Sequence, residues 1–118
     1  MGPLTGVKIV EIAGIGPGPF CAMMLADMGA DVIRVDRAAA VRGGDPAVPP
    51  NDIINRGRRS VGVDLKSPEG VETVLRLVEQ ADGLIEDSAP VWRSVSASDR
   101  RSVARNPALA YGRMTGWG

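Results

Sequence analysis

The stretch EIAGIGPGPF, residues 11–20, places three glycines between an apolar segment and a helix-like segment. A helix that begins directly after a strand presents unpaired backbone N–H groups and a partial positive charge at its start. Gly14, Gly16 and Gly18 carry no side chains, so a ligand could approach the backbone closely. This arrangement favours a site for an anion or a nucleotide. A plain tight turn would explain the same glycines, and the residues alone leave both interpretations open.

An acidic residue, Asp36, follows this glycine stretch after a second apolar segment. Glycines after a strand, with an acid about 20 residues further on, are typical of dinucleotide-binding folds. Two residues argue against NAD as the ligand. The third glycine of that pattern would fall at position 19, which is Pro19, and Arg37 beside Asp36 suits a phosphate better than a ribose hydroxyl.

The charge balance excludes some classes of partner. Fourteen acidic and fourteen basic residues cancel, which gives no case for a nucleic-acid or membrane surface. No apolar run reaches the ~18 residues of a membrane span. The single Cys21 cannot form an internal disulfide, so a cytoplasmic protein is expected. The sequence has no His, the commonest general base near neutral pH.

The elements that must position these residues alternate between strand and helix. A helix is expected from Pro17 or Pro19 to Gly29, and a second one after the Ser67–Pro68 pair. In the second helix Val71, Val74, Leu75 and Val78 form one apolar face. Strands are expected at residues 7–13, 30–36, 60–65, 83–86 and 109–114. This order predicts an α/β fold, a Rossmann-like open parallel sheet with flanking helices.

The 118 residues fit one domain or part of one. Residues 38–56 are small, polar and rich in Pro and Gly, which predicts a long loop, and loops of that length are usually functional or mobile. We expect Cys21 and Met23 to pack in the core rather than take part in chemistry.

The glycine stretch and two later segments carry a resemblance. AGIGPGPFCAMMLADMGADVIRVDR at 13–37, NRGRRSVGVDLKSPEG at 55–70 and YGRMTGWG at 111–118 resemble the family III CoA-transferase and α-methylacyl-CoA racemase proteins, in order and at nearly normal spacing. IRVDR and RMTGWG look more like the racemase branch. The resemblance implies the N-terminal, CoA-binding part of an enzyme that acts on acyl-CoA, with an interlocked homodimer for a full-length chain.

Residue roles carried over by motif place coenzyme A at the carboxyl ends of the strands. Arg37 would meet the adenosine phosphate region, and Lys66 the phosphates. A helix start with Arg and Lys beside it is a sensible phosphate cradle. Lys66 could instead only flank a helix, and Arg58 and Arg59 could be a solvated pair. The implied coenzyme A contacts are Ile15, Gly16, Arg37, Val63 and Lys66.

The resemblance implies no metal and no cofactor apart from the coenzyme A of the substrate. Racemases of this family use a His and an Asp to move the α-proton through an enolate, whereas the transferases use an Asp nucleophile. Both sets follow the TGWG block, where this sequence ends, so we assign no catalytic residue here and expect residues 1–118 alone to show no racemase activity. A racemase fragment, a CoA-transferase fragment and a non-catalytic remnant that holds coenzyme A weakly all remain open.

One stretch departs from the resemblance. Family members read similarly to EGFRPGVAERLGIG where this chain has EDSAPVWRSVSASD, residues 86–99. The family's two arginines, which line the CoA channel, align with Ala89 and Val95. One legal back-translation restores the family sequence when one base is inserted after the first codon. We therefore interpret residues 87–103 as a frameshifted segment that should pack poorly; a divergent surface loop is the alternative.

Overall fold

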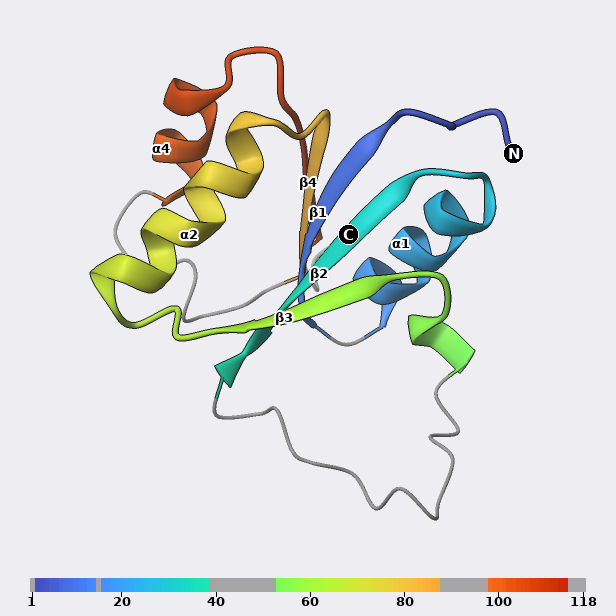
Figure 1. Ribbon diagram of the computed structural model, residues 1–118, viewed down its shortest axis with the longest axis horizontal. Coiled ribbons are helices and arrows are strands. Elements are labelled where there is room, and N and C mark those ends of the chain that lie inside the picture. Colours follow the sequence, from blue (N-terminus) through green and yellow to red (C-terminus); the bar gives the residue numbers. More distant parts are fainter. Residues whose placement is uncertain (1, 15, 39–52, 88–97, 115–118) are drawn as a thin grey trace.

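The computed structural model describes residues 2–14, 16–38, 53–87 and 98–114 (Figure 1). The elements, in chain order, are β1 (Lys8–Ile12), α1 (Pro17–Asp27), β2 (Asp31–Arg37), the short 3₁₀ helix η2 (Ile53–Asn55), β3 (Arg59–Val63), α2 (Pro68–Glu79), β4 (Gly83–Asp87), α4 (Ser98–Arg105) and β5 (Ala110–Met114).

Five parallel strands form one open sheet in the order β3-β2-β1-β4-β5. Helix α1 lies on one face of the sheet, and α2 and α4 lie on the other (Figure 1). Each helix connects two parallel strands, as parallel pairing requires. The structure therefore confirms the predicted α/β class and the parallel sheet with flanking helices.

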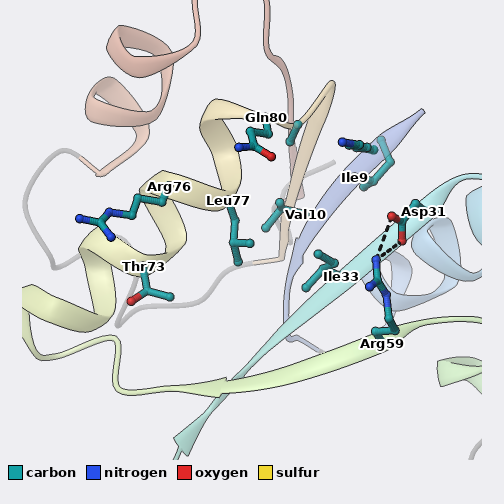
Figure 2. Close-up of a pocket in the computed structure, with 11 residues that line it drawn as sticks. Ile9, Val10, Asp31, Ile33, Arg59, Thr73, Arg76, Leu77 and Gln80 are labelled. Atoms are coloured by element: carbon teal, nitrogen blue, oxygen red, sulfur yellow. Dashed lines mark hydrogen bonds and ion pairs between the residues drawn. The ribbon is translucent and has the colours of Figure 1, made fainter. Parts of the chain in front are cut away.

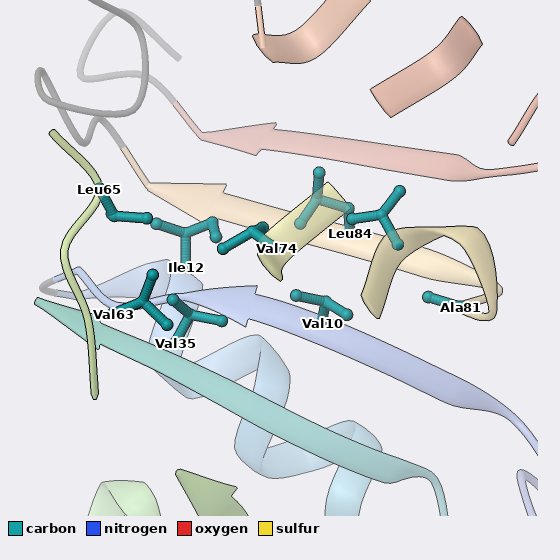
Figure 3. Close-up of a cluster of buried hydrophobic side chains, with 9 residues drawn as sticks. Val10, Ile12, Val35, Val63, Leu65, Val74, Ala81 and Leu84 are labelled. Atoms are coloured by element: carbon teal, nitrogen blue, oxygen red, sulfur yellow. The ribbon is translucent and has the colours of Figure 1, made fainter. Parts of the chain in front are cut away.

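The larger core lies between the sheet and α2. Apolar residues alternate along the strands, so every second side chain reaches this layer. Figure 3 shows how side chains of β1, β2 and β4 meet those of α2. The buried members of this cluster are Val10, Ile12, Val35, Val63, Leu65, Val74, Val78, Ala81 and Leu84.

Helix α2 follows the sequence prediction closely. The Ser67 hydroxyl accepts a hydrogen bond from the Gly70 N–H at 3.0 Å, and Pro68 occupies the first turn. A Cβ at Gly70 would stand only 1.9 Å from the carbonyl oxygen of Asp64, so the turn into the helix requires glycine there. The predicted apolar face is confirmed, since Val71, Val74, Leu75 and Val78 are all buried.

Helix α1 differs, because much of its apolar surface faces outward. Phe20, Met24 and Met28 are exposed, although they recur at the spacing of one helix face. Cys21 is also exposed, so the expectation that it packs in the core is wrong; the buried positions in this part of the helix are Gly18, Pro19 and Ala22.

Two segments expected to be irregular overlap the described residues only in part. Within the predicted loop 38–56, residues 53–55 form the 3₁₀ helix η2, and residues 39–52 lie outside the described residues. Within segment 87–103, residues 88–97 also lie outside, but α4 begins at Ser98, so the end of the segment does form regular structure.

Helix α4 is tied to α2 by charge and by backbone contacts. The Arg105 guanidinium donates to Glu72 and to Glu79, with the shortest contact to each carboxylate at 2.7 Å. The Asn106 amide donates to the carbonyl oxygens of Val78 and Ala81 at 2.9 and 2.7 Å. These contacts supply a physical reason for helix at 98–105 despite its irregular apolar pattern.

Candidate functional site

The strand order of the sheet reverses between β1 and β4. The connection through α1 runs on one face and the connections through α2 and α4 run on the other, so β1 and β4 are neighbours whose crossovers diverge. In open α/β sheets, ligands bind outside the carboxyl ends of strands at such a point. The predicted site residues that the structure describes, Gly16, Arg37, Val63 and Lys66, lie in or directly after the segments that follow the carboxyl ends of β1, β2 and β3.

Gly16 caps the start of α1 in a conformation that favours glycine. Its φ is +87°, and a Cβ placed on it would meet no atom within 4 Å, so the backbone angle rather than crowding selects glycine. No side chain caps this helix end, and Pro17 follows at the first position. An uncovered helix start is a suitable place for an anion. Ile15, the neighbouring predicted contact, lies outside the described residues.

Arg37, Val63 and Lys66 are brought together by strand register. Arg37 ends β2 directly beside Val63, which ends β3, and Lys66 follows three residues later. Both cationic side chains are exposed, and within the described part of the chain neither forms an ion pair with a carboxylate. The Val63 side chain is only 6% exposed and belongs to the core, so its backbone is the part available to a ligand. The roles of these residues in binding stay predictions.

Glu86 and Arg113, which sequence reasoning passed over, occupy the same edge on β4 and β5. They are register partners, and the Nε of Arg113 lies 3.1 Å from Oε1 of Glu86. The Glu86 side chain is fully enclosed and its carboxylate oxygens make no hydrogen bond within the described residues, because the approach of Arg113 is close without being well directed. A carboxylate in the otherwise apolar segment GLIE was the available signal.

A second enclosed carboxylate, Glu11 of β1, lies on the face that carries α1. We call the residues around it the Glu11 network; it comprises Glu11, Arg34, Asp36, Asn55 and Arg58. Glu11 and Arg58 form an ion pair in which the two side chains are 0% and 1% exposed. Burial raises the pKa of the Glu11 carboxyl above its ordinary value, and the hydrogen bond and charge of Arg58 oppose that shift.

The rest of the Glu11 network reaches the end of β2. The side-chain amide oxygen Oδ1 of Asn55 accepts a hydrogen bond from Arg34 and another, at 3.0 Å, from Arg58. Arg34 Nε donates to Asp36 Oδ1 at 3.1 Å. These side chains, with Ser60, line a polar cavity of about 190 Å³. Asp36 is thus held by an arginine of its own strand, an arrangement unlike an acid that binds ribose.

The alternative interpretation of Arg58 and Arg59 as a solvated pair is right for one member only. Arg59 is 71% exposed and its Nη2 lies 2.7 Å from Oδ1 of Asp31, whereas Arg58 is enclosed against Glu11. Adjacent residues of a strand point to opposite faces, which explains why two neighbouring arginines have such different surroundings. The acid in KIVEI, inside an apolar strand, was the signal for a buried partner.

A cleft larger than that polar cavity lies away from the predicted site, near the amino ends of β1, β2 and β3 (Figure 2). It holds about 510 Å³ and opens where α2 leaves β2 and β3 uncovered. Ile33 and Leu77 lie toward its interior, and Asp31 pairs with Arg59 at its rim (Figure 2). Because it contains none of the predicted contacts and no arrangement of groups that would perform chemistry, we place the candidate site at the carboxyl edge.

Two other kinds of feature are absent from the described residues. No cluster of three His, Cys, Asp or Glu side chains in this part of the chain could hold a metal ion. No helix among the same residues is long and apolar enough to cross a membrane.

Comparison with known proteins agrees with the resemblance. The model of CoA-transferase family III matches residues 4–118. The α-methylacyl-CoA racemase of Mus musculus is 38% identical over 116 residues, covering 98% of this chain and 28% of its own length. The succinate–glutarate CoA-transferase of Agrobacterium fabrum is 39% identical over 134 residues, covering 98% of this chain and 33% of its own length.

A solved structure gives the same result at the level of the fold. A CAIB/BAIF family protein from Brucella suis superposes with a TM-score of 0.81 at 35% identity, covering 98% of this chain and 34% of that protein. The chain therefore spans about one third of the length of these relatives.

Proposed function

The chain belongs to CoA-transferase family III, and from this premise we propose that residues 1–118 form the coenzyme A-binding part of an acyl-CoA racemase. The reaction would be epimerisation at the α-carbon of a 2-methylacyl-CoA thioester through an enolate. A homodimer and a cytoplasmic location, both expected from the sequence, are part of the same proposal.

The observation that carries the binding role is the pair of exposed cations at the carboxyl edge. Arg37 and Lys66 follow neighbouring strands, and no carboxylate among the described residues forms an ion pair with either. Unpaired cations beside an uncapped helix start would hold phosphate groups through charge-assisted hydrogen bonds. Gly16 would let the ligand reach the backbone of α1.

The racemase branch is supported by the continuity of the match. The alignments with the mouse and human racemases run over 116 and 118 residues, close to the length of this chain. Those with transferases of stated substrate run over 124 to 134 residues, so they require gaps. Sequence identity does not separate the two branches, because it is 38% to the mouse racemase and 39% to the succinate–glutarate CoA-transferase. A CoA-transferase is therefore the second candidate.

The chain's own residues would bind and orient rather than transfer protons. The sequence has no His, and the family's catalytic groups follow the TGWG block that ends at Gly118. We therefore propose that the thioester's coenzyme A lies along the ends of β1, β2 and β3, while the acid and base come from outside these residues.

Binding is tested by calorimetric titration of the protein with coenzyme A. Arg37→Gln and Lys66→Gln should each weaken the affinity by about tenfold, which corresponds to about 1.4 kcal/mol for one charge-assisted contact. Arg76→Gln is the matched control, because Arg76 is an exposed cation beside the cleft of Figure 2 rather than at the carboxyl edge. Equal losses in all three variants would show that the effect is only one of net charge, and the proposed site would be wrong.

The reaction is tested by incubating the complete gene product with a 2-methylacyl-CoA in heavy water. If the protein is a racemase, the 2-methylacyl-CoA gains one deuterium at its α-carbon and both epimers form. Mass spectrometry detects the deuterium, and chiral chromatography separates the epimers. A transferase instead moves coenzyme A to an added free carboxylate without exchange at the α-carbon. Transfer without exchange would reject the racemase assignment and favour the second candidate.

A further inference from the structure

Building on the proposed function, we propose that Arg113 donates a hydrogen bond to the thioester carbonyl oxygen of an acyl-CoA, and that Glu86 is the positioning residue that holds Arg113 there. The phosphates of coenzyme A would then lie at the ends of β2 and β3, and the thioester at the ends of β4 and β5. The two ends of the ligand are thus assigned to different strands, which the proposed function by itself does not specify.

Arg37 and Arg113 lie on the same face of the sheet. Side chains alternate along a strand, so residues two apart share a face. Arg37 follows two residues after Val35, which belongs to the core beneath α2 (Figure 3). Arg113 is the register partner of Glu86, which follows two residues after Leu84 of the same core. Both arginines therefore lie on the α2 side of the carboxyl edge, where one ligand can meet both.

The spacing of the two arginines suits the arm that joins the phosphates of coenzyme A to its thioester. In the order β3-β2-β1-β4-β5, the strands that carry Arg37 and Arg113 are three spacings apart, which amounts to about 14 Å. The pantetheine arm has as many backbone atoms as about four residues, and it spans about 14 Å when extended. A ligand whose phosphate meets Arg37 would therefore place its thioester beside Arg113.

The surroundings of Arg113 suit an uncharged acceptor rather than another phosphate. Its Nε lies 3.1 Å from Oε1 of Glu86, whose side chain is fully enclosed, so the charge of the guanidinium is compensated locally. By contrast, no carboxylate among the described residues forms an ion pair with Arg37 or Lys66. A thioester oxygen carries only a partial negative charge, so it matches the compensated cation, and the phosphates match the other two.

Glu86 can hold Arg113 without competing for the ligand. Within the described part of the chain, Arg113 is the only cation that forms an ion pair with this carboxylate, and an enclosed charge without a partner is costly. The Arg113 side chain is 37% exposed, whereas Glu86 is out of a ligand's reach. A guanidinium has several N–H donors in a planar fork, so it can contact a carboxylate and donate to a ligand oxygen together.

The test compares coenzyme A with 2-methylpropanoyl-CoA by calorimetric titration of the complete gene product. The α-carbon of this thioester carries identical methyl groups, so removal and return of its proton regenerate the same compound. Arg113→Met should weaken the affinity for the thioester by about tenfold, the loss of one hydrogen bond from a charged donor, and leave that for coenzyme A within about twofold. Arg37→Gln should weaken both affinities equally, by about tenfold.

The ratio of the two affinities separates positioning from loss of stability, because unfolded protein binds neither ligand. Glu86→Gln should weaken binding of the thioester by about threefold and leave coenzyme A unaffected, because Arg113 stays but is held less firmly. Arg59→Met is the matched control. Arg59 is also an edge-strand arginine beside a carboxylate, 2.7 Å from Asp31, but it begins β3 at the opposite edge, so its loss should leave both affinities unchanged.

Equal loss of both affinities in Arg113→Met, no loss at all, or the same change of ratio in Arg59→Met would each overturn the proposal. An unchanged ratio in Glu86→Gln would reject its positioning role. Should Arg113→Met fail to fold, Arg113→Lys keeps the charge without the planar fork, and it should show a smaller loss for the thioester alone. If the unmodified protein binds neither ligand, the proposed function itself is rejected, so the two failures are distinguishable.

Discussion

Two carboxylates, Glu11 on β1 and Glu86 on β4, are both fully enclosed in adjacent strands, but their partners differ. The partner of Glu11 is Arg58, which is itself 1% exposed. The partner of Glu86 is Arg113, which is 37% exposed and lies on the edge strand β5. The side chains point to opposite faces, because Glu11 is in register with Ile85 while Glu86 is in register with Ile12.

The difference lies in how the described residues surround the two carboxylates. On the face of α1, η2 and the turn before β3 bring an arginine over the sheet and enclose the pair. On the face of α2, the arginine that approaches Glu86 among the described residues is Arg113 of the edge strand, which is 37% exposed. The first carboxylate is therefore part of the interior, whereas the second borders the region where ligands of such sheets bind.

The largest expected effect comes from the same substitution made at both positions. Glu11→Gln should lower the free energy of unfolding by about 3 kcal/mol, because it leaves the buried Arg58 charge without its counter-ion. Glu86→Gln should change it by less than about 1 kcal/mol, because Arg113 can turn toward water. Urea unfolding at neutral pH followed by circular dichroism measures both.

The comparison is sharpened by removing both members of the enclosed pair. The double variant Glu11→Leu, Arg58→Met should have a free energy of unfolding that is higher than that of the unmodified protein or at most about 1 kcal/mol lower. Apolar groups often replace a buried ion pair without loss of stability. Equal losses in Glu11→Gln and Glu86→Gln would break the distinction between the two sites. If the double variant loses as much unfolding free energy as Glu11→Gln, the destabilisation comes from packing rather than from charge.

The sequence predicted those parts of the fold that depend on local patterns. The strands and α2 follow from alternating apolar residues, from Ser67 and Pro68 at a helix start, and from the four buried residues of one helix face. The candidate site was expected at the carboxyl edge because any parallel sheet collects the ends of its strands at one edge, and its role in binding stays a prediction. The register of Arg37 beside Val63 agrees with that expectation.

The remainder depends on contacts between distant residues. Nothing in the sequence near Glu11 identifies Arg58, 47 residues later, as its partner. Helix α4 is held by Arg105 through carboxylates of α2, which no local period would reveal. The exposure of Cys21 follows from which face of α1 meets the sheet, and an apolar helix has no polar side to indicate that choice.

The smallest expected effect is a difference in how stability depends on pH, and it follows from the sign of the pKa shifts. The pKa of Glu11 is raised by burial above its ordinary value of 4.5, so the folded chain keeps this proton at pH values where the unfolded chain has lost it. Stability from Glu11 is therefore present below the ordinary pKa and falls as pH rises toward the raised value. The pKa of Glu72 is lowered by Arg105, so its contribution is present above the ordinary value and is lost as pH falls.

Urea unfolding from pH 3.5 to 7.5 separates these two slopes. The stability of the unmodified protein minus that of the Glu11→Leu, Arg58→Met variant should decrease as pH rises above about 4.5, because arginine does not titrate in this range and only Glu11 contributes. The same subtraction with Glu72→Gln should give a slope of the opposite sign at the acidic end. A difference for the Glu11 variant that rises with pH would mean that Arg58 outweighs burial. The pair would then behave as an ordinary surface ion pair, and its contrast with Glu86 would rest on geometry alone.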